Sequence, residues 1–190
     1  QRLFFVNIGD SRIYVRRKGG QLKQITRDDN LLQRRVDLEE VTPEEAEVID
    51  QAPNPQLLEP RLKNYARHRN IITKSVGIGM PTEDLEVSYV DLRPGDRFVI
   101  VSDGVSDQML TERIGRITEG SKDDEQAEEA LQQEALQMSL DGSDPRSKGD
   151  DISALVKTIE ERGPDRAYLR PEVLPIRTQE SLKKTVQDIH

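Results

Sequence analysis

The chain has 190 residues, a formal net charge of −8, 34% hydrophobic residues and 4% aromatic residues. This apolar share lies below the usual value of about 45–50%, so the chain can bury only a small core. An acidic chain with no broad basic face argues against a nucleic-acid partner. The absence of cysteine excludes disulfides, zinc–thiolate sites and thiol nucleophiles.

The N-terminal part of the chain predicts strands. Apolar or alternating stretches are separated by the turn sequences Gly9-Asp10-Ser11 and Lys18-Gly19-Gly20. They predict a meander of three antiparallel strands with short connections. These strands are expected at residues 3–8, 12–16 and 21–26. Asp10 is then expected in the first hairpin turn.

The next part of the chain predicts helices and a loop. Apolar spacing over 28–39 suggests one helix. Thr42-Pro43-Glu44-Glu45 predicts the start of another, because Thr42 can cap it, Pro43 fits its first position and Glu45 completes a capping box. Residues 51–60 hold three prolines and predict a loop. The following stretch, 61–69, is basic and could contact an anion.

The second half of the chain predicts further strands and two helices. The strands are expected at 70–74, 85–92, 97–102 and 152–159, and the helices at 111–118 and 125–140. Helices that are grouped apart from strands favour an α+β layered fold over an alternating parallel sheet. We expect a core domain over 1–160 and a charged, proline-containing extension over 161–190.

Acidic residues stand at several expected strand ends. Asp103 and Asp107 follow the apolar strand 97–102, Asp150 and Asp151 precede the last strand, and Asp10 lies in the first turn. Gly104 would let the chain turn tightly beside Asp103. If these ends converge, Mg²⁺ or Mn²⁺ would offset the concentrated negative charge. Taken singly, each aspartate is better explained by turn chemistry than by metal binding.

Six segments, in order, resemble elements of the type 2C family of metal-dependent protein serine/threonine phosphatases. The segments are Asn7-Ile8-Gly9-Asp10-Ser11-Arg12, Gly20-Gln21-Leu22 through Ile25-Thr26-Arg27-Asp28, Thr42-Pro43-Glu44-Glu45, Asn70 to Gly77, Leu92-Arg93-Pro94-Gly95-Asp96 with Ser102 to Asp107, and Gly149-Asp150-Asp151-Ile152-Ser153. In the last segment Asp151 stands where the family has asparagine. The resemblance implies a layered antiparallel β-sandwich flanked by helices.

The resemblance also implies a metal site with two or three Mg²⁺ or Mn²⁺ ions. Asp103 and Asp150 match ligands of the two-metal centre, and Asp10 and Asp107 match acids of a third, weaker site. Residues 51–69 match the flap that influences substrate choice, although its prolines are unusual. The first metal-binding acid, the phosphate-binding arginine and the proposed general acid of the family lie upstream of the first segment. We therefore expect the domain to be N-terminally incomplete, with no catalytic residue in this chain.

The expected activity of the intact protein is hydrolysis of phosphoserine and phosphothreonine on proteins by metal-activated water, in signalling. A non-catalytic phosphatase-like regulatory or binding module is the alternative. The segment order disfavours a third possibility, a small-molecule phosphatase or nuclease. We expect phosphorylated proteins as partners and, because no apolar run is long enough, no membrane span. The lack of cysteine is compatible with a reducing cytosol, and a cytoplasmic location is expected.

Overall fold

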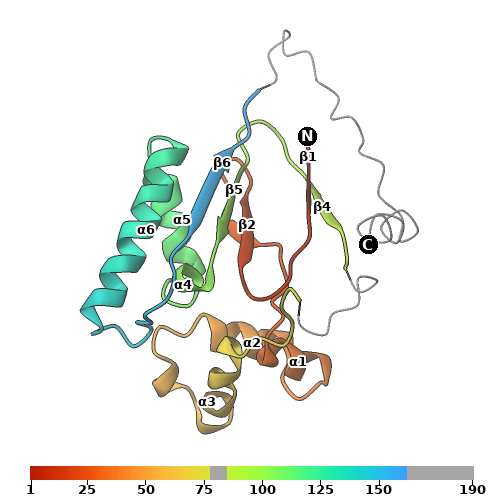
Figure 1. Ribbon diagram of the computed structural model, residues 1–190, viewed down its shortest axis with the longest axis vertical. Coiled ribbons are helices and arrows are strands. Elements are labelled where there is room, and N and C mark those ends of the chain that lie inside the picture. The colour runs from red at the N-terminus through yellow and green to blue at the C-terminus, as the bar shows by residue number, and fades with distance from the viewer. Residues whose placement is uncertain (78–84, 162–190) are drawn as a thin grey trace, which may run out of the picture. The chain divides into compact units, whose positions relative to one another are not determined.

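The computed structural model describes residues 1–77 and 85–161 (Figure 1). Its strands form two antiparallel sheets, as the sequence predicted. The larger sheet has the order β3-β2-β5-β6 and the smaller one pairs β1 with β4. The strands are β1 (Arg2–Phe5), β2 (Arg12–Arg16), β3 (Leu22–Gln24), β4 (Ser88–Asp91), β5 (Arg97–Val101) and β6 (Ala154–Thr158).

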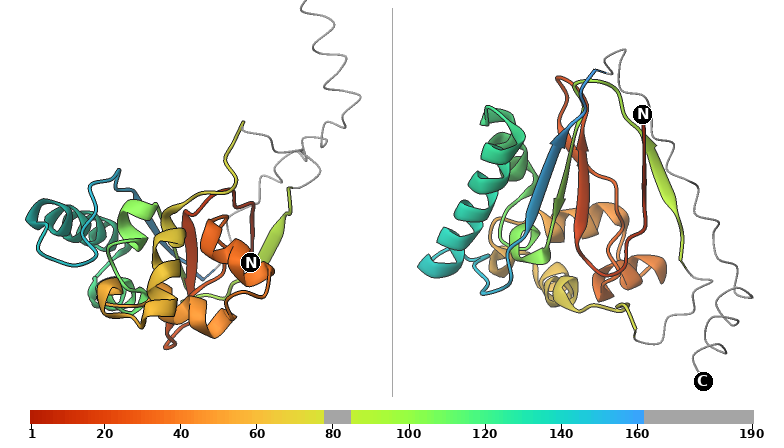
Figure 2. Two further views of the ribbon diagram at one scale, coloured as in Figure 1. Left: turned by 90° about the horizontal axis from the view of Figure 1, so that it is seen from below. Right: turned by 45° about the horizontal axis from the view of Figure 1, so that its top comes forward.

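Three helices pack with the larger sheet. They are α4 (Asp103–Ser106), α5 (Thr111–Gly120) and α6 (Asp124–Asp141). Figures 1 and 2 show α5 and α6 on one side of the sheet, with the β1–β4 ribbon on the other side. Tyr14, Val99 and Val156 from the sheet meet Ile114 and Leu131 from the helices in the main core. The interior of this layer is therefore small and built largely from β-branched and aliphatic residues.

A second group of helices has its own core. It contains α1 (Leu31–Asp37), α2 (Pro43–Asp50), the 3₁₀ turn η1 (Pro55–Leu57), α3 (Pro60–Ala66) and the 3₁₀ turn η2 (Arg67–Asn70). Leu32, Val41, Ile49 and Leu62 are buried together among them. The group lies beside the end of the sheet where β5 finishes (Figure 1).

The predicted start of α2 is confirmed. Thr42 Oγ1 accepts a hydrogen bond from the Glu45 amide at 3.2 Å, and the Glu45 carboxylate accepts one from the Thr42 amide at 3.0 Å. Pro43 is the first helical residue. The capping box satisfies two amides at the N-terminus of α2.

The predicted three-stranded meander is wrong at its first step. β1 pairs with β4, in the register Leu3↔Val90, and does not pair with β2. Six residues separate β1 from β2, and Gly9 adopts φ +97°, so the chain leaves one sheet and enters the other. Asp10 therefore lies in a bend between the two sheets, not in a hairpin turn.

Two other sequence interpretations are corrected. Residues 70–74 are not a strand, because only Ile72 forms a β-bridge, with Asn30, before that partner segment becomes α1. The proline-rich loop is partly helical, since Pro55 opens η1 and Pro60 opens α3. Proline suits the first turn of a helix because the amide it lacks would have no intrahelical partner there.

The first compact unit spans Gln1–Glu160. Residues 162–190 lie outside the described part of the chain, so the predicted C-terminal extension stays a prediction. Among the described residues, no helix has the length and apolar character needed to cross a membrane.

Candidate active site

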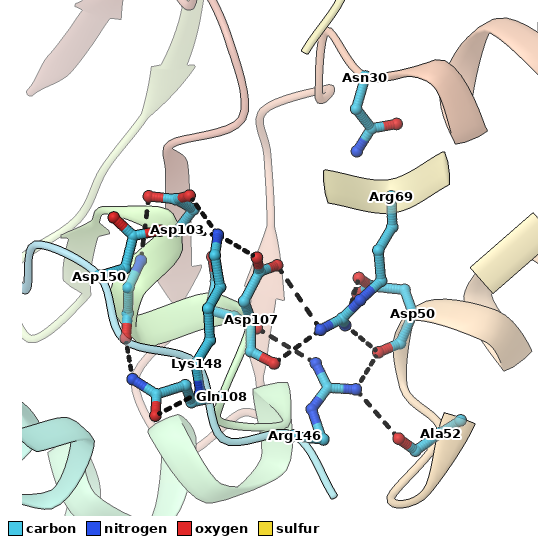
Figure 3. A network of polar contacts seen from close by, with 12 residues as sticks. Asn30, Asp50, Ala52, Arg69, Asp103, Asp107, Gln108, Arg146, Lys148 and Asp150 are labelled. Carbon is cyan, nitrogen blue, oxygen red and sulfur yellow. Dashed lines mark hydrogen bonds and ion pairs between the residues drawn. The ribbon is translucent and has the colours of Figure 1, made fainter. Parts of the chain in front are cut away.

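Four charged side chains meet where β5 ends and β6 begins (Figure 3). Lys148 Nζ lies 2.8 Å from Asp103 Oδ2, 2.9 Å from Asp107 Oδ2 and 2.7 Å from Asp150 Oδ2. We call the three carboxylates the acid cluster. The predicted approach of Asp103 and Asp150, 47 positions apart, is confirmed, because both contact one nitrogen atom. Their role as metal ligands stays a prediction.

Strand pairing places the two ends of the cluster side by side. β5 and β6 are antiparallel, with Val101 opposite Ala154, so the end of one strand adjoins the start of the other. Ser102 continues the contact beyond the strands. Its hydroxyl donates to the Asp151 carbonyl at 2.9 Å and accepts from the Ser153 amide at 3.0 Å. The segment that carries Asp150 is thereby held against the start of α4.

Gly104 permits this close approach. A Cβ atom added at Gly104 would lie 2.3 Å from the Asp151 carbonyl oxygen and 2.9 Å from its carbonyl carbon. The backbone of Gly104 belongs to α4 and has no positive φ. The interpretation of Gly104 as a tight-turn residue is therefore wrong, and the residue is needed because two backbone segments nearly touch.

Asp10 faces the acid cluster without an ion pair to Lys148 in the described structure. Burial, together with the negative charges of Asp103 and Asp107, raises the pKa of Asp10 to about 6. The structure therefore brings all four predicted acids, Asp10, Asp103, Asp107 and Asp150, into one electrostatic environment. Within residues 1–77 and 85–161 no basic side chain forms an ion pair with Asp10, and a carboxylate in such a setting favours the approach of a further positive charge.

Two buried arginines lie on the other side of Asp107 from Lys148 (Figure 3). Arg69 donates to the Asp107 carbonyl at 2.8 Å, and its guanidinium lies 3.8 Å from the carboxylates of Asp107 and Asp50. Arg146 donates to the carbonyls of Asp50 (2.7 Å) and Ala52 (3.0 Å). They join the helical group α1–α3 to the residue that ends α4.

These arginines change how the basic stretch 61–69 is understood. Arg69 is buried and turned toward carboxylates of the protein itself, and the exposed Arg61 pairs with Glu45. Burial, together with the neighbouring positive charge of Arg69, lowers the pKa of Arg146 to about 10. Sequence reasoning did not identify Arg146 or Lys148. Both lie in a polar loop, and the residues of this loop show no periodic pattern of apolar positions from which a contact could be predicted.

Arg12, the last residue of the first family-like segment, is buried between two aspartates. Its guanidinium lies 2.6 Å from Asp28 and 2.8 Å from Asp50. Burial alone would raise the pKa of Asp50, but Arg12, with Arg69 and Arg146, holds it below its usual value. Two segments of the resemblance, those ending in Arg12 and Asp28, therefore meet in a buried structural ion pair.

The acid cluster has the donor chemistry of a hard-cation site, but its centre is taken by an ammonium group. Carboxylate oxygens are the ligands that Mg²⁺ prefers, at about 2.0–2.1 Å. Within residues 1–77 and 85–161, no three acidic or histidine side chains are spaced to hold a metal ion between them. Lys148 fills the position instead. The donors Asp103, Asp107 and Asp150 fit the metal in kind, and a metal would have to replace the lysine.

The sequence matches the protein phosphatase 2C family over residues 1–141. The chain belongs to this family. It is 37% identical over 113 residues to the serine/threonine protein phosphatase PstP of Mycobacterium tuberculosis, a stretch that is 60% of this chain and 18% of PstP. It is also 37% identical over 119 residues to a putative protein phosphatase 2C-type of Streptococcus pyogenes, covering 62% of this chain and 40% of that protein.

Solved structures of phosphatase 2C relatives share the fold. The crystal structure of M. tuberculosis PstP matches 84% of this chain and 55% of its own, with a TM-score of 0.58 and 30% identity. The catalytic domain of PstP in complex with two manganese ions matches with a TM-score of 0.54 and 27% identity, over 84% of this chain and 55% of that one. The chain thus spans about half the length of these phosphatase structures, and 18–40% of the curated relatives.

Proposed function

We propose that a protein containing this chain is a metal-dependent protein serine/threonine phosphatase, which hydrolyses phosphoserine and phosphothreonine on protein substrates. One observation carries the proposal. The two acids that the phosphatase 2C resemblance assigns to the metal centre, Asp103 and Asp150, both reach a single cation position. Family membership supports phosphorylated proteins as the substrate class.

Asp103 and Asp150 would hold the cation, with Asp107 and Asp10 close enough to add a further, weaker site. The PstP catalytic domain was solved with two manganese ions, which supports Mn²⁺ or Mg²⁺ here. When bound, such ions activate water for attack on phosphorus and neutralise the phosphoryl oxygens.

The other residues of this chain position the acids. Arg69 fixes the end of α4 through the Asp107 carbonyl, and the Ser102 contacts fix the segment of Asp150. By the resemblance, the phosphate-binding arginine and the general acid are not among the segments matched here. We therefore propose that turnover needs a polypeptide that also carries those elements, and that the 190-residue chain alone has no useful activity.

The experiment compares the 190-residue chain with a polypeptide that also contains the remaining phosphatase 2C elements. Both are assayed on a phosphothreonine peptide, with Mn²⁺ and with EDTA. The longer protein should turn over only with metal, and Asp103→Asn should lower kcat at least about 100-fold. Asp91→Asn is the matched control, because Asp91 is an exposed carboxylate whose ion pair is with Arg2. A longer protein that stays inactive with every divalent ion contradicts the proposal.

One observation favours a second candidate, a non-catalytic phosphatase-like binding module. Lys148 already offsets part of the negative charge of the acid cluster, which would help to keep the fold intact without a metal. The two candidates differ in the longer protein: a binding module would hold a phosphopeptide without hydrolysing it, whatever metal is supplied.

A further inference from the structure

Lys148 stands where the cation of the acid cluster would be. Its ammonium group has three N–H donors, and three carboxylate oxygens, one each from Asp103, Asp107 and Asp150, lie 2.7–2.9 Å away. These are ordinary lengths for charge-assisted hydrogen bonds. All the donors of Lys148 are therefore matched by acceptors from the acids that would otherwise meet a metal.

We propose that Lys148 is a tethered competitor of the metal: its ammonium occupies the centre of the acid cluster in the metal-free protein, and a divalent ion binds only by displacing it. The inference rests on the proposed metal site. It adds a residue that sets metal affinity and that none of the family-like segments contains.

The two cations cannot share the centre. A divalent ion in contact with the same carboxylates would lie within a few ångströms of the ammonium, where like charges repel strongly in a partly buried site. Lys148 Nζ lies within hydrogen-bonding distance of all three carboxylates, at 2.7–2.9 Å. A metal ion that takes these carboxylate oxygens removes the acceptors of the ammonium, so the side chain has to move.

The surroundings of Lys148 allow that movement. The residue lies in the loop before β6, its side chain is 29% exposed, and its amide donates to Gln108 Oε1 at 3.3 Å. It also lines a cavity of about 350 Å³ between α3 and this loop. The four-carbon stem can turn into this space while the backbone stays anchored.

The test measures Mn²⁺ binding to the 190-residue chain through the EPR signal of free Mn²⁺. Lys148→Gln removes the ammonium and keeps a side chain of similar length, whereas Lys148→Arg keeps the charge. Lys122→Gln is the matched control, because it makes the same change in net charge at an exposed lysine between α5 and α6. K148Q should bind Mn²⁺ about tenfold more tightly or better, since the metal no longer breaks charge-assisted hydrogen bonds. K148R and K122Q should stay within about twofold of the wild type.

Thermal unfolding gives a second readout that needs no activity. Without metal, K148Q should unfold about 2–4 °C below the wild type, because the three carboxylates lose their cation. Saturating Mn²⁺ should raise the midpoint of K148Q more than that of the wild type, as ligand linkage requires. Adding Asp103→Asn to K148Q should remove the gain in Mn²⁺ affinity, which places the effect at the acid cluster.

The results separate this inference from the proposed function. If K148Q and the wild type bind Mn²⁺ equally tightly, the competitor role of Lys148 is overturned while the metal site stands. If K148Q binds more weakly, Lys148 supports the site and the inference is also overturned. If no variant of the 190-residue chain binds Mn²⁺ while metal-free K148Q is less stable, the competitor role of Lys148 is overturned, and the proposed function is decided separately by the assay of the longer protein.

Discussion

Gly104→Ala tests how closely the two halves of the acid cluster must approach. The added Cβ would lie 2.3 Å from the Asp151 carbonyl oxygen, a distance that real Cβ contacts do not show. The nearest atom is backbone, so no side chain can rotate away. The segment must retreat by about 0.7 Å or more before the contact reaches even a tight 3.0 Å.

Such overpacking in a well-packed region costs about 1–3 kcal/mol. The same movement carries the segment of Lys148 and Asp150 away from α4, so the contact of Lys148 with Asp103, now 2.8 Å, lengthens to about 3.5 Å, where a hydrogen bond is weak. Metal-free G104A should therefore unfold at lower urea concentration than the wild type, and it should also bind Mn²⁺ more weakly.

The assay is equilibrium urea unfolding followed by circular dichroism. Gly120→Ala is the matched control, because Gly120 ends α5 and an added Cβ there meets nothing within 4 Å. G120A should be unchanged or more stable by up to about 1 kcal/mol, as expected for alanine in place of glycine in a helix. If G104A and G120A both unfold with the wild type, the close approach at Gly104 does not hold the acid cluster together.

Two further predictions concern stability away from the cluster. Thr42→Ala should lower the free energy of unfolding by about 1 kcal/mol, because it removes the hydroxyl that caps α2. Thr42→Ser keeps a hydroxyl and should unfold like the wild type. If urea melts show the same loss of stability for both variants, the hydroxyl does not stabilise α2. Burial would raise the pKa of Asp96, but hydrogen bonds from the amides of Arg93 and Lys18 and from the Arg17 guanidinium lower it. A carboxylate with a lowered pKa stabilises the fold above its unfolded pKa of about 3.9, and this contribution is lost as pH falls through the folded pKa. Asp96→Asn should therefore lower the free energy of unfolding by about 1.5–3 kcal/mol at pH 7. Below about pH 4 the variant should lose less stability than the wild type, because it has no carboxylate at this position to protonate. Urea melts from pH 3 to 7 measure both effects, and a variant with the same pH profile as the wild type would contradict this.

The sequence predicted those features that depend on neighbouring residues. The capping box at Thr42 and Glu45 uses residues three positions apart, so its geometry follows from the helix itself. The strand before Asp103 was visible because a buried strand needs a continuous apolar run, and 98–101 is one. The order of the family-like segments indicated the fold and the acids before any contact was known.

Tertiary structure decided which distant residues meet. β1 pairs with β4 and not with β2, because six residues and the positive φ of Gly9 carry the chain into the other sheet. Lys148 reaches the acid cluster because the pairing of β5 with β6 and the missing side chain of Gly104 bring its loop against α4. Electrostatic contacts of this kind depend on distance in space, and a polar loop has no spacing in its sequence that reveals which charges will lie within 3 Å of each other.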